Sequence, residues 1–145
     1  MALIPLIITD EELDSVIETI ADDEVTPSKT YRLDLNTGDV YAEFIDHEEA
    51  VHQAVVKLVK TARDRYIIYT SDYGCEIRDV LGRVYSKEYL DMEIPRLINE
   101  AVLVDDRVEE TTDYEIIIEG DELSISFKVL TTTGDTIEIE MEVEI

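Results

Sequence analysis

The sequence predicts an α+β domain in which an N-terminal β-hairpin precedes two main helices packed on an antiparallel sheet, with a C-terminal three-stranded meander. Three patterns carry this prediction. Apolar residues alternate on both sides of an Asn-Thr-Gly turn, two central stretches follow helical spacing, and the last third returns to a period of two. Because the helical stretches lie between strands of antiparallel type, we expect the helices to cover one face of a sheet.

The length and composition fit one domain with a core of its own. The chain has 145 residues, of which 45% are hydrophobic. We expect residues 29–145 to form this domain and residues 1–28 to form an N-terminal arm with a short helix. In the arm, Pro5 interrupts an apolar run, and Thr9 can cap a helix that carries Leu13 and Val16 on one side.

The stretch from Asp46 to Gly74 holds the centre of the predicted domain. It follows a hairpin in which alternating residues flank the turn at 36–38. Asp46 caps an amphipathic helix and can form a capping box with Glu49. After Thr61, a run of β-branched and aromatic residues predicts a short strand over 63–69 that ends at a Tyr-Gly turn.

The remaining elements follow from spacing and turn residues. A brief helix over 77–81 stops at Gly82, and a second long helix ends at Val102, with Pro95 at a kink or in its first turn. From Val108 onward, strands with alternating apolar residues are separated by Gly-Asp turns at 120–121 and 134–135, which predicts the meander.

The charge excludes several kinds of partner. Twelve basic and 36 acidic residues give a net charge of −24, which repels nucleic acid and anionic membranes. Residues 29–104 are the least acidic part, with 14 acids and ten bases, so basic residues concentrate around the central helix. No run is long and apolar enough to span a bilayer, and the N-terminus lacks the basic flank of a signal peptide. Two interpretations of the charge remain: it keeps the protein soluble, or it has a role in assembly with other proteins.

Catalytic and metal-binding patterns are missing from the sequence. Cys75 is the single cysteine, which excludes an internal disulfide and a zinc site of clustered thiolates. His47 and His52 point about 140° apart on a helix, so they cannot share a metal there. No glycine-rich phosphate loop or nucleophile elbow occurs. We therefore expect no enzyme activity, no cofactor and no bound metal.

Three sets of residues are candidates for contacts with other proteins. Arg63 and Arg65 alternate along the predicted strand and can meet carboxylates of another chain, or of this one. Asp105, Asp106 and Arg107 lie at the joint between the second helix and the meander, where the alternative is an ordinary polar turn. The last strand, Ile137 to Ile145, alternates core residues with an acidic row that either keeps the sheet soluble or binds a basic strand of a partner at a sheet edge. The row consists of Glu138, Glu140, Glu142 and Glu144.

The order of several motifs along nearly the whole chain resembles a known family. The motifs are YRLDLNTGDV, EEAVHQAV, KTARDRYIIYTSDYGCEI, INEAVLVDDRV and SFKVLTTTGD. In this order they are similar to the XkdS-type proteins of PBSX-like prophages. More distantly they resemble the gpW and gene-25-like baseplate wedge proteins, the sheath initiators of contractile phage tails.

This resemblance implies a structural part of the tail baseplate. Its expected partners are other baseplate wedge proteins and the proteins of the tail tube and sheath, in the virion tail and, during assembly, in the host cytoplasm. The family carries a Glu-Pro-Arg contact motif after its second helix. Asp105, Asp106 and Arg107 occupy those positions, and only the arginine is retained.

Two other function classes remain as alternatives. An acidic binding module, such as a nucleic-acid mimic or inhibitor, would use the charge of −24. A tail-associated lysozyme would need an acid and a nucleophile, and 36 carboxylates offer no distinctive pair.

Overall fold

The computed structural model describes residues 28–144 and contains two small antiparallel sheets and three helices. The predicted N-terminal helix and Ile145 lie outside these residues. A hairpin of β1 (Thr30–Leu33) and β2 (Val40–Ile45) is followed by α2 (His47–Lys60), α3 (Ile77–Leu81) and α4 (Lys87–Val102). The meander consists of β3 (Val108–Glu119), β4 (Glu122–Thr131) and β5 (Thr136–Glu144) in that spatial order.

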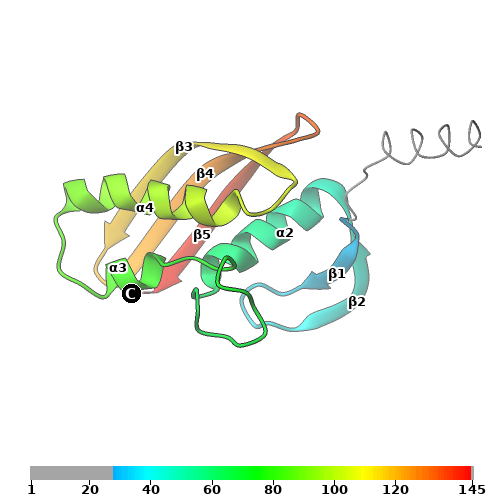
Figure 1. Cartoon of the computed structure of the whole chain (residues 1–145), viewed down its shortest axis with the longest axis horizontal. Coiled ribbons are helices and arrows are strands. Elements are labelled where there is room, and N and C mark those ends of the chain that lie inside the picture. Colours follow the sequence, from blue (N-terminus) through cyan, green and yellow to red (C-terminus); the bar gives the residue numbers. More distant parts are fainter. Residues whose placement is uncertain (1–27, 145) are drawn as a thin grey trace, which may run out of the picture.

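The core lies between the meander and the helices on one of its faces. Figure 1 shows α4 across the three-stranded sheet, with α2 between this sheet and the hairpin. Alternate residues of β4 and β5, among them Phe127 and Ile139, are buried in one cluster with Ile98 of α4 and Val55 of α2. The α+β fold class, the hairpin, both long helices and the meander are therefore confirmed. Within residues 28–144, no helix has the length and hydropathy of a membrane span.

The two long helices begin at side-chain caps. Asp46 accepts a hydrogen bond from the N–H of His47 at 2.8 Å, and Ser86 accepts one from Tyr89 at 3.3 Å. The predicted capping box at α2 is wrong, because the carboxylate of Glu49 binds Arg32 of β1 at 3.1 Å instead. Pro95 lies inside α4, beyond its first turn.

The hairpin is attached to α2 by one buried side chain. The amide of Gln53 donates to the carbonyl of Tyr31 at 3.0 Å and accepts from the N–H of Leu33 at 2.8 Å. It thereby satisfies one backbone donor and one acceptor of β1, as a neighbouring strand would. The alternation predicted for the hairpin is present, but its aromatic residues are exposed. Tyr31 stacks on Phe44 at a centroid distance of 4.5 Å, and both residues are more than half exposed.

Candidate functional site: surfaces for partner proteins

The last strand lies at an edge of the meander, as predicted. Along β5, Ile137, Ile139, Met141 and Val143 are buried and the four glutamates of the acidic row are exposed. Nine consecutive residues of β5 pair with β4 without a shift in register. Within the described residues, no strand pairs with the other side of β5, and α2 is in contact with this strand.

The acidic row concentrates negative charge beside this edge. Glu142 is the main cause of a raised pKa at Glu122 of β4, with smaller contributions from Glu119 and Glu144. A groove of about 510 Å³ adjoins the row, and Lys60 and His52 of α2 are among its lining residues. A positively charged segment is therefore the electrostatically suitable occupant of this surface.

The joint between α4 and β3 is held by an ion pair within the loop. The guanidinium of Arg107 donates from Nε to Oδ1 of Asp105 at 2.9 Å and from Nη2 to Oδ2 at 2.7 Å. Burial opposes the charge of Asp105, but these bonds and the N–H of Arg107 outweigh burial and lower the pKa of the carboxyl. The same bonds raise the pKa of Arg107.

The joint also connects to neighbouring elements. The carbonyl of Arg107 accepts from the N–H of Thr132 in the β4–β5 turn at 3.0 Å, and Asp106 is exposed. Arg107 lines a cleft of about 680 Å³ with Thr133 of that turn and Glu48 of α2. The predicted site residues of the joint thus lie together, with Asp105 and Arg107 already paired to each other.

Arg63 and Arg65 do not lie on a strand, so the predicted strand over 63–69 is wrong. The segment is an irregular loop whose only ladder contact is a parallel bridge between Ala62 and Cys75. Arg63 points inward with 14% of its side chain exposed, whereas Arg65 is exposed. The two side chains therefore do not share one side, and the intramolecular alternative applies to Arg63.

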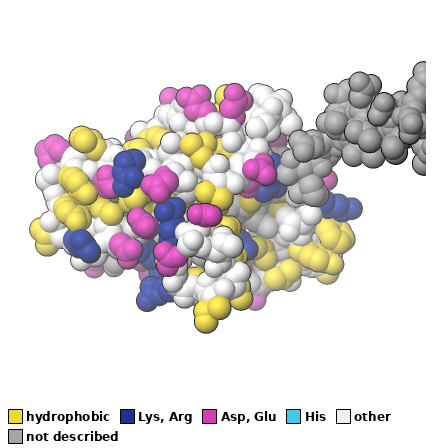
Figure 2. Space-filling model, viewed as in Figure 1, with side chains coloured by type: hydrophobic (Ala, Val, Ile, Leu, Met, Phe, Trp, Pro, Cys, Tyr) yellow, Lys and Arg dark blue, Asp and Glu magenta, His cyan; other side chains and the backbone are white. Residues whose placement is uncertain are grey.

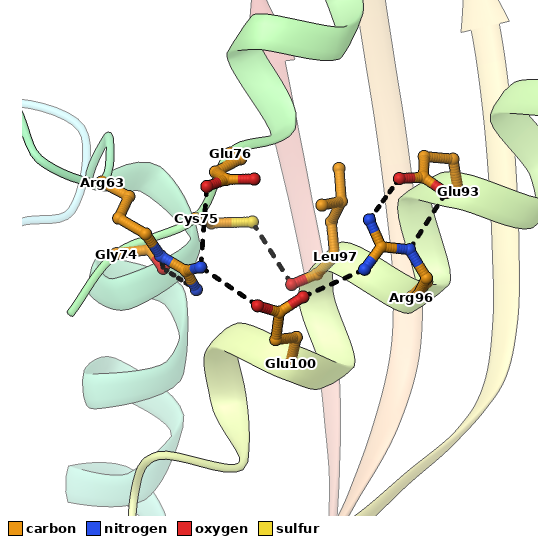
Figure 3. A network of polar contacts seen from close by, with 8 residues as sticks. All are labelled: Arg63, Gly74, Cys75, Glu76, Glu93, Arg96, Leu97 and Glu100. Atoms are coloured by element: carbon orange, nitrogen blue, oxygen red, sulfur yellow. Dashed lines mark hydrogen bonds and ion pairs between the residues drawn. The ribbon is translucent and has the colours of Figure 1, made fainter. Parts of the chain in front are cut away.

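The guanidinium of Arg63 is the centre of a polar network (Figure 3). It donates to the carbonyl of Gly74 at 3.3 Å and 3.2 Å, and to Glu100 of α4 at 3.2 Å. Glu76 lies 3.7 Å away, and Glu100 also binds Arg96, which pairs with Glu93. The network joins the start of the α2–α3 loop to α4.

Cys75 is a buried core residue beside this network. Its thiol lies 3.8 Å from the carbonyl of Leu97, and burial raises the pKa of the thiol to about 11. It is therefore a protonated, poorly nucleophilic thiol at neutral pH. In residues 28–144, no group of three or more histidine, cysteine, aspartate or glutamate residues is placed to hold a metal ion.

Sequence reasoning missed the exposed apolar residues of the α2–α3 loop. Ile67 and Ile68 are 103% and 84% exposed, and neighbouring Tyr66 is 53% exposed. Figure 2 shows hydrophobic side chains gathered at the lower edge of the molecule and over the hairpin. The sequence feature that could have indicated an exposed apolar surface was the Ile67-Ile68 pair. We interpreted this pair as part of a strand, because β-branched residues favour strands.

The comparisons with known proteins agree with the resemblance indicated by the sequence motifs. The family described as contractile injection system sheath initiator matches residues 29–134. The chain is also similar to the Phage-like element PBSX protein XkdS of Bacillus subtilis (strain 168). The two are 42% identical over 143 residues, which cover 97% of this chain and 95% of the relative. Both matches include most of the chain, and the chain belongs to the sheath initiator family of contractile injection systems.

Proposed function

We propose that this chain is a structural, non-catalytic part of a phage tail baseplate that starts the contractile sheath by binding a basic strand of a sheath protein at β5. Family membership and the similarity to a protein of a phage-like element support the tail role. The observation that carries the strand-binding step is the regular edge of β5, which pairs with no second strand within residues 28–144, beside a row of four glutamates.

The other edge of the same sheet is less suited to accept a strand. The pairing of β3 with β4 shifts in register twice, and Asp113 has a φ of 55° at one of these shifts. Such irregularities twist an edge and interrupt its row of donors and acceptors. β5 has neither feature, so a partner can form a longer ladder there.

The acidic row determines which charge a binding partner must carry. Two copies of β5 pairing edge to edge would bring like charges together, each close pair being unfavourable by some tenths of a kcal/mol. A strand bearing lysine or arginine reverses that sign and adds main-chain hydrogen bonds. The row therefore favours binding of a different, basic segment over self-association.

A second contact involves the joint of Asp105, Asp106 and Arg107, and it fits other baseplate wedge proteins or the tail tube. The Asp105–Arg107 pair fixes the backbone of the joint, while exposed Asp106 and the adjoining cleft remain open to a partner. In this proposal the protein works in the baseplate of the virion tail after assembly in the host cytoplasm.

The experiment replaces the four glutamates of the row by lysine and counts baseplates that carry a sheath by electron microscopy. We expect a folded variant on whose baseplates no sheath begins, because repulsion replaces attraction to the basic strand. The matched control replaces four exposed carboxylates that do not line the groove, namely Glu88, Asp91, Glu109 and Glu110, which changes the net charge equally. Normal sheaths on the β5 variant would refute strand binding at this edge.

A further inference from the structure

The α2–α3 loop combines an apolar tip with an ordered base. We call Tyr66–Ile68 the tip and the segments 61–63 and 74–76 the stem. Ile67 and Ile68 are adjacent and nearly fully exposed, whereas Gly74 and Cys75 of the stem are buried. A tip of this kind stays exposed only if it is held away from the core.

The stem is fixed by backbone contacts that leave no room for a side chain. The N–H of Cys75 donates to the carbonyl of Thr61 at 2.8 Å. Gly74 has a φ of 107°, and a Cβ at this position would meet the carbonyl oxygen of Thr61 at 2.8 Å and the nitrogen of Arg63 at 2.9 Å. Only glycine fits here without moving the stem.

Arg63 anchors the stem to the rest of the domain. Its guanidinium joins the Gly74 carbonyl to Glu100 of α4, which is 37 positions further along the chain (Figure 3). The stem is therefore tied to two helices, α2 by the chain itself and α4 by this ion pair. A movement of the stem relative to α4 would break these contacts.

Aromatic side chains support the part of the loop between stem and tip. Tyr69 stacks on Tyr73 at a centroid distance of 4.3 Å, and Tyr66 meets Tyr69 edge-on at 6.4 Å. The ammonium of Lys57 in α2 lies 5.4 Å from the Tyr69 ring. This stacking holds the tip in one orientation relative to α2.

A pre-organised apolar tip has the properties of a binding hot spot. A partner that buries it loses little conformational entropy, because the loop is already ordered, and gains the hydrophobic effect of two isoleucines. Contacts of this kind cluster in a few residues at the centre of an interface. Exposed Arg65 beside the tip can meet carboxylates at the rim of the partner surface.

We propose that Ile67 and Ile68 insert into an apolar pocket with an acidic rim on a neighbouring baseplate protein. A protein partner fits better than an anionic membrane, because the net charge of −24 and the carboxylates of Asp64 and Asp72 repel a broadly anionic surface. A single carboxylate on a protein surface can still meet Arg65. This inference rests on the proposed function, and it concerns a surface separate from β5.

The first experiment places a photo-crosslinking amino acid at Ile68 in the full chain and irradiates assembled tails. We expect a crosslink to a different baseplate subunit. The control position is Val84, which is 104% exposed in the α3–α4 connection, and should give none. A chain that enters tails but forms no crosslink at 68, or crosslinks only to a second copy of itself, overturns the loop inference alone. A chain that never enters tails overturns the proposed function as well.

The second experiment measures binding of the crosslinked subunit, once purified, to Ile67→Ser/Ile68→Ser and to Val84→Ser. We expect the double variant to bind about tenfold more weakly or worse, with an unchanged Tm, and the control to bind normally. Equal binding by both overturns the proposal. Flotation with vesicles of neutral and of anionic lipid tests the membrane alternative, and co-flotation that the double variant loses would also overturn it.

Discussion

Replacement of Arg63 by methionine tests whether the partly buried guanidinium stabilises the domain. Methionine retains much of the unbranched, aliphatic part of the arginine side chain. It removes two hydrogen bonds to the carbonyl of buried Gly74 and the contact to Glu100. Hydrogen bonds to charged groups contribute about 1.5–3 kcal/mol. Both bonds share one acceptor, the Gly74 carbonyl, so we count them as one contribution, which their lengths of 3.2 Å and 3.3 Å place in the lower part of this range. The half-exposed ion pair adds about 0.5 kcal/mol.

We therefore expect Arg63→Met to lower the free energy of unfolding by about 2–3 kcal/mol. At about 4 °C per kcal/mol, the corresponding decrease in Tm is roughly 8–12 °C. Urea unfolding followed by circular dichroism measures the change as a lower midpoint at constant slope.

The matched control is Arg65→Met, two positions along the same loop. Arg65 is exposed, so its replacement should change the free energy of unfolding by less than about 0.5 kcal/mol. Equal effects of the two substitutions would refute the reasoning, because they would show that the network of Arg63 contributes no more than a solvated surface charge.

Three further outcomes are expected. Gly74→Ala should lower the free energy of unfolding by about 1–3 kcal/mol more than Gly134→Ala, because both glycines have positive φ but only Gly74 has backbone atoms in the way; thermal unfolding compares them. Asp105→Asn should cost about 1–2 kcal/mol at pH 7. This loss should vanish in acid. Because the pKa of Asp105 is lower in the folded state, its ionised carboxylate stabilises the fold above the unfolded-state pKa, and this stabilisation disappears as the pH falls through the folded-state pKa. Urea titrations at pH 7 and pH 2 measure the difference. Glu122→Gln should stabilise the protein slightly at pH 7 and not near pH 3, because neighbouring glutamates raise the pKa of Glu122; the same titrations test the sign.

Long periodic segments explain why most of the fold was predictable. The alternation in β4 and β5 extends over nine paired positions, and a shift by one residue would expose every buried side chain of β5. The same alternation indicated that the glutamates face solvent. The edge position of β5 was predictable because the meander ends there.

The α2–α3 loop was mispredicted because its composition favours a strand and its conformation depends on distant partners. Ile67 and Ile68 have high β propensity, but a strand needs a neighbour for its backbone, and here only Ala62 forms a bridge. The position of Arg63 depends on Glu100 in α4, and local sequence does not show which carboxylate an arginine will meet.

The hairpin shows a similar dependence on tertiary context. Alternation correctly predicted that Tyr31 and Phe44 share one face, yet that face is exposed. The reason is that Gln53 binds the backbone of β1 and places the hairpin beside α2, away from the core of the meander. Gln53 is a polar residue on the buried side of α2, and this position was the sequence feature that could have indicated the contact. Its role could be recognised only once the backbone groups that it binds were known.

The arrangement of charge on the meander bears on the alternative of a nucleic-acid mimic. Successive glutamates of the acidic row are about 6.6–6.8 Å apart, since each strand residue rises about 3.3 Å. A duplex presents two rows of phosphates, however, so a mimic needs a second row of carboxylates. The adjacent positions on β4 are Glu122, Ser124, Ser126 and Lys128, of which only Glu122 is acidic, so β4 does not supply a second row. A single acidic row beside a strand edge that is unpaired within residues 28–144 is better matched by one basic strand, which supports the proposed sheath initiation over mimicry of DNA.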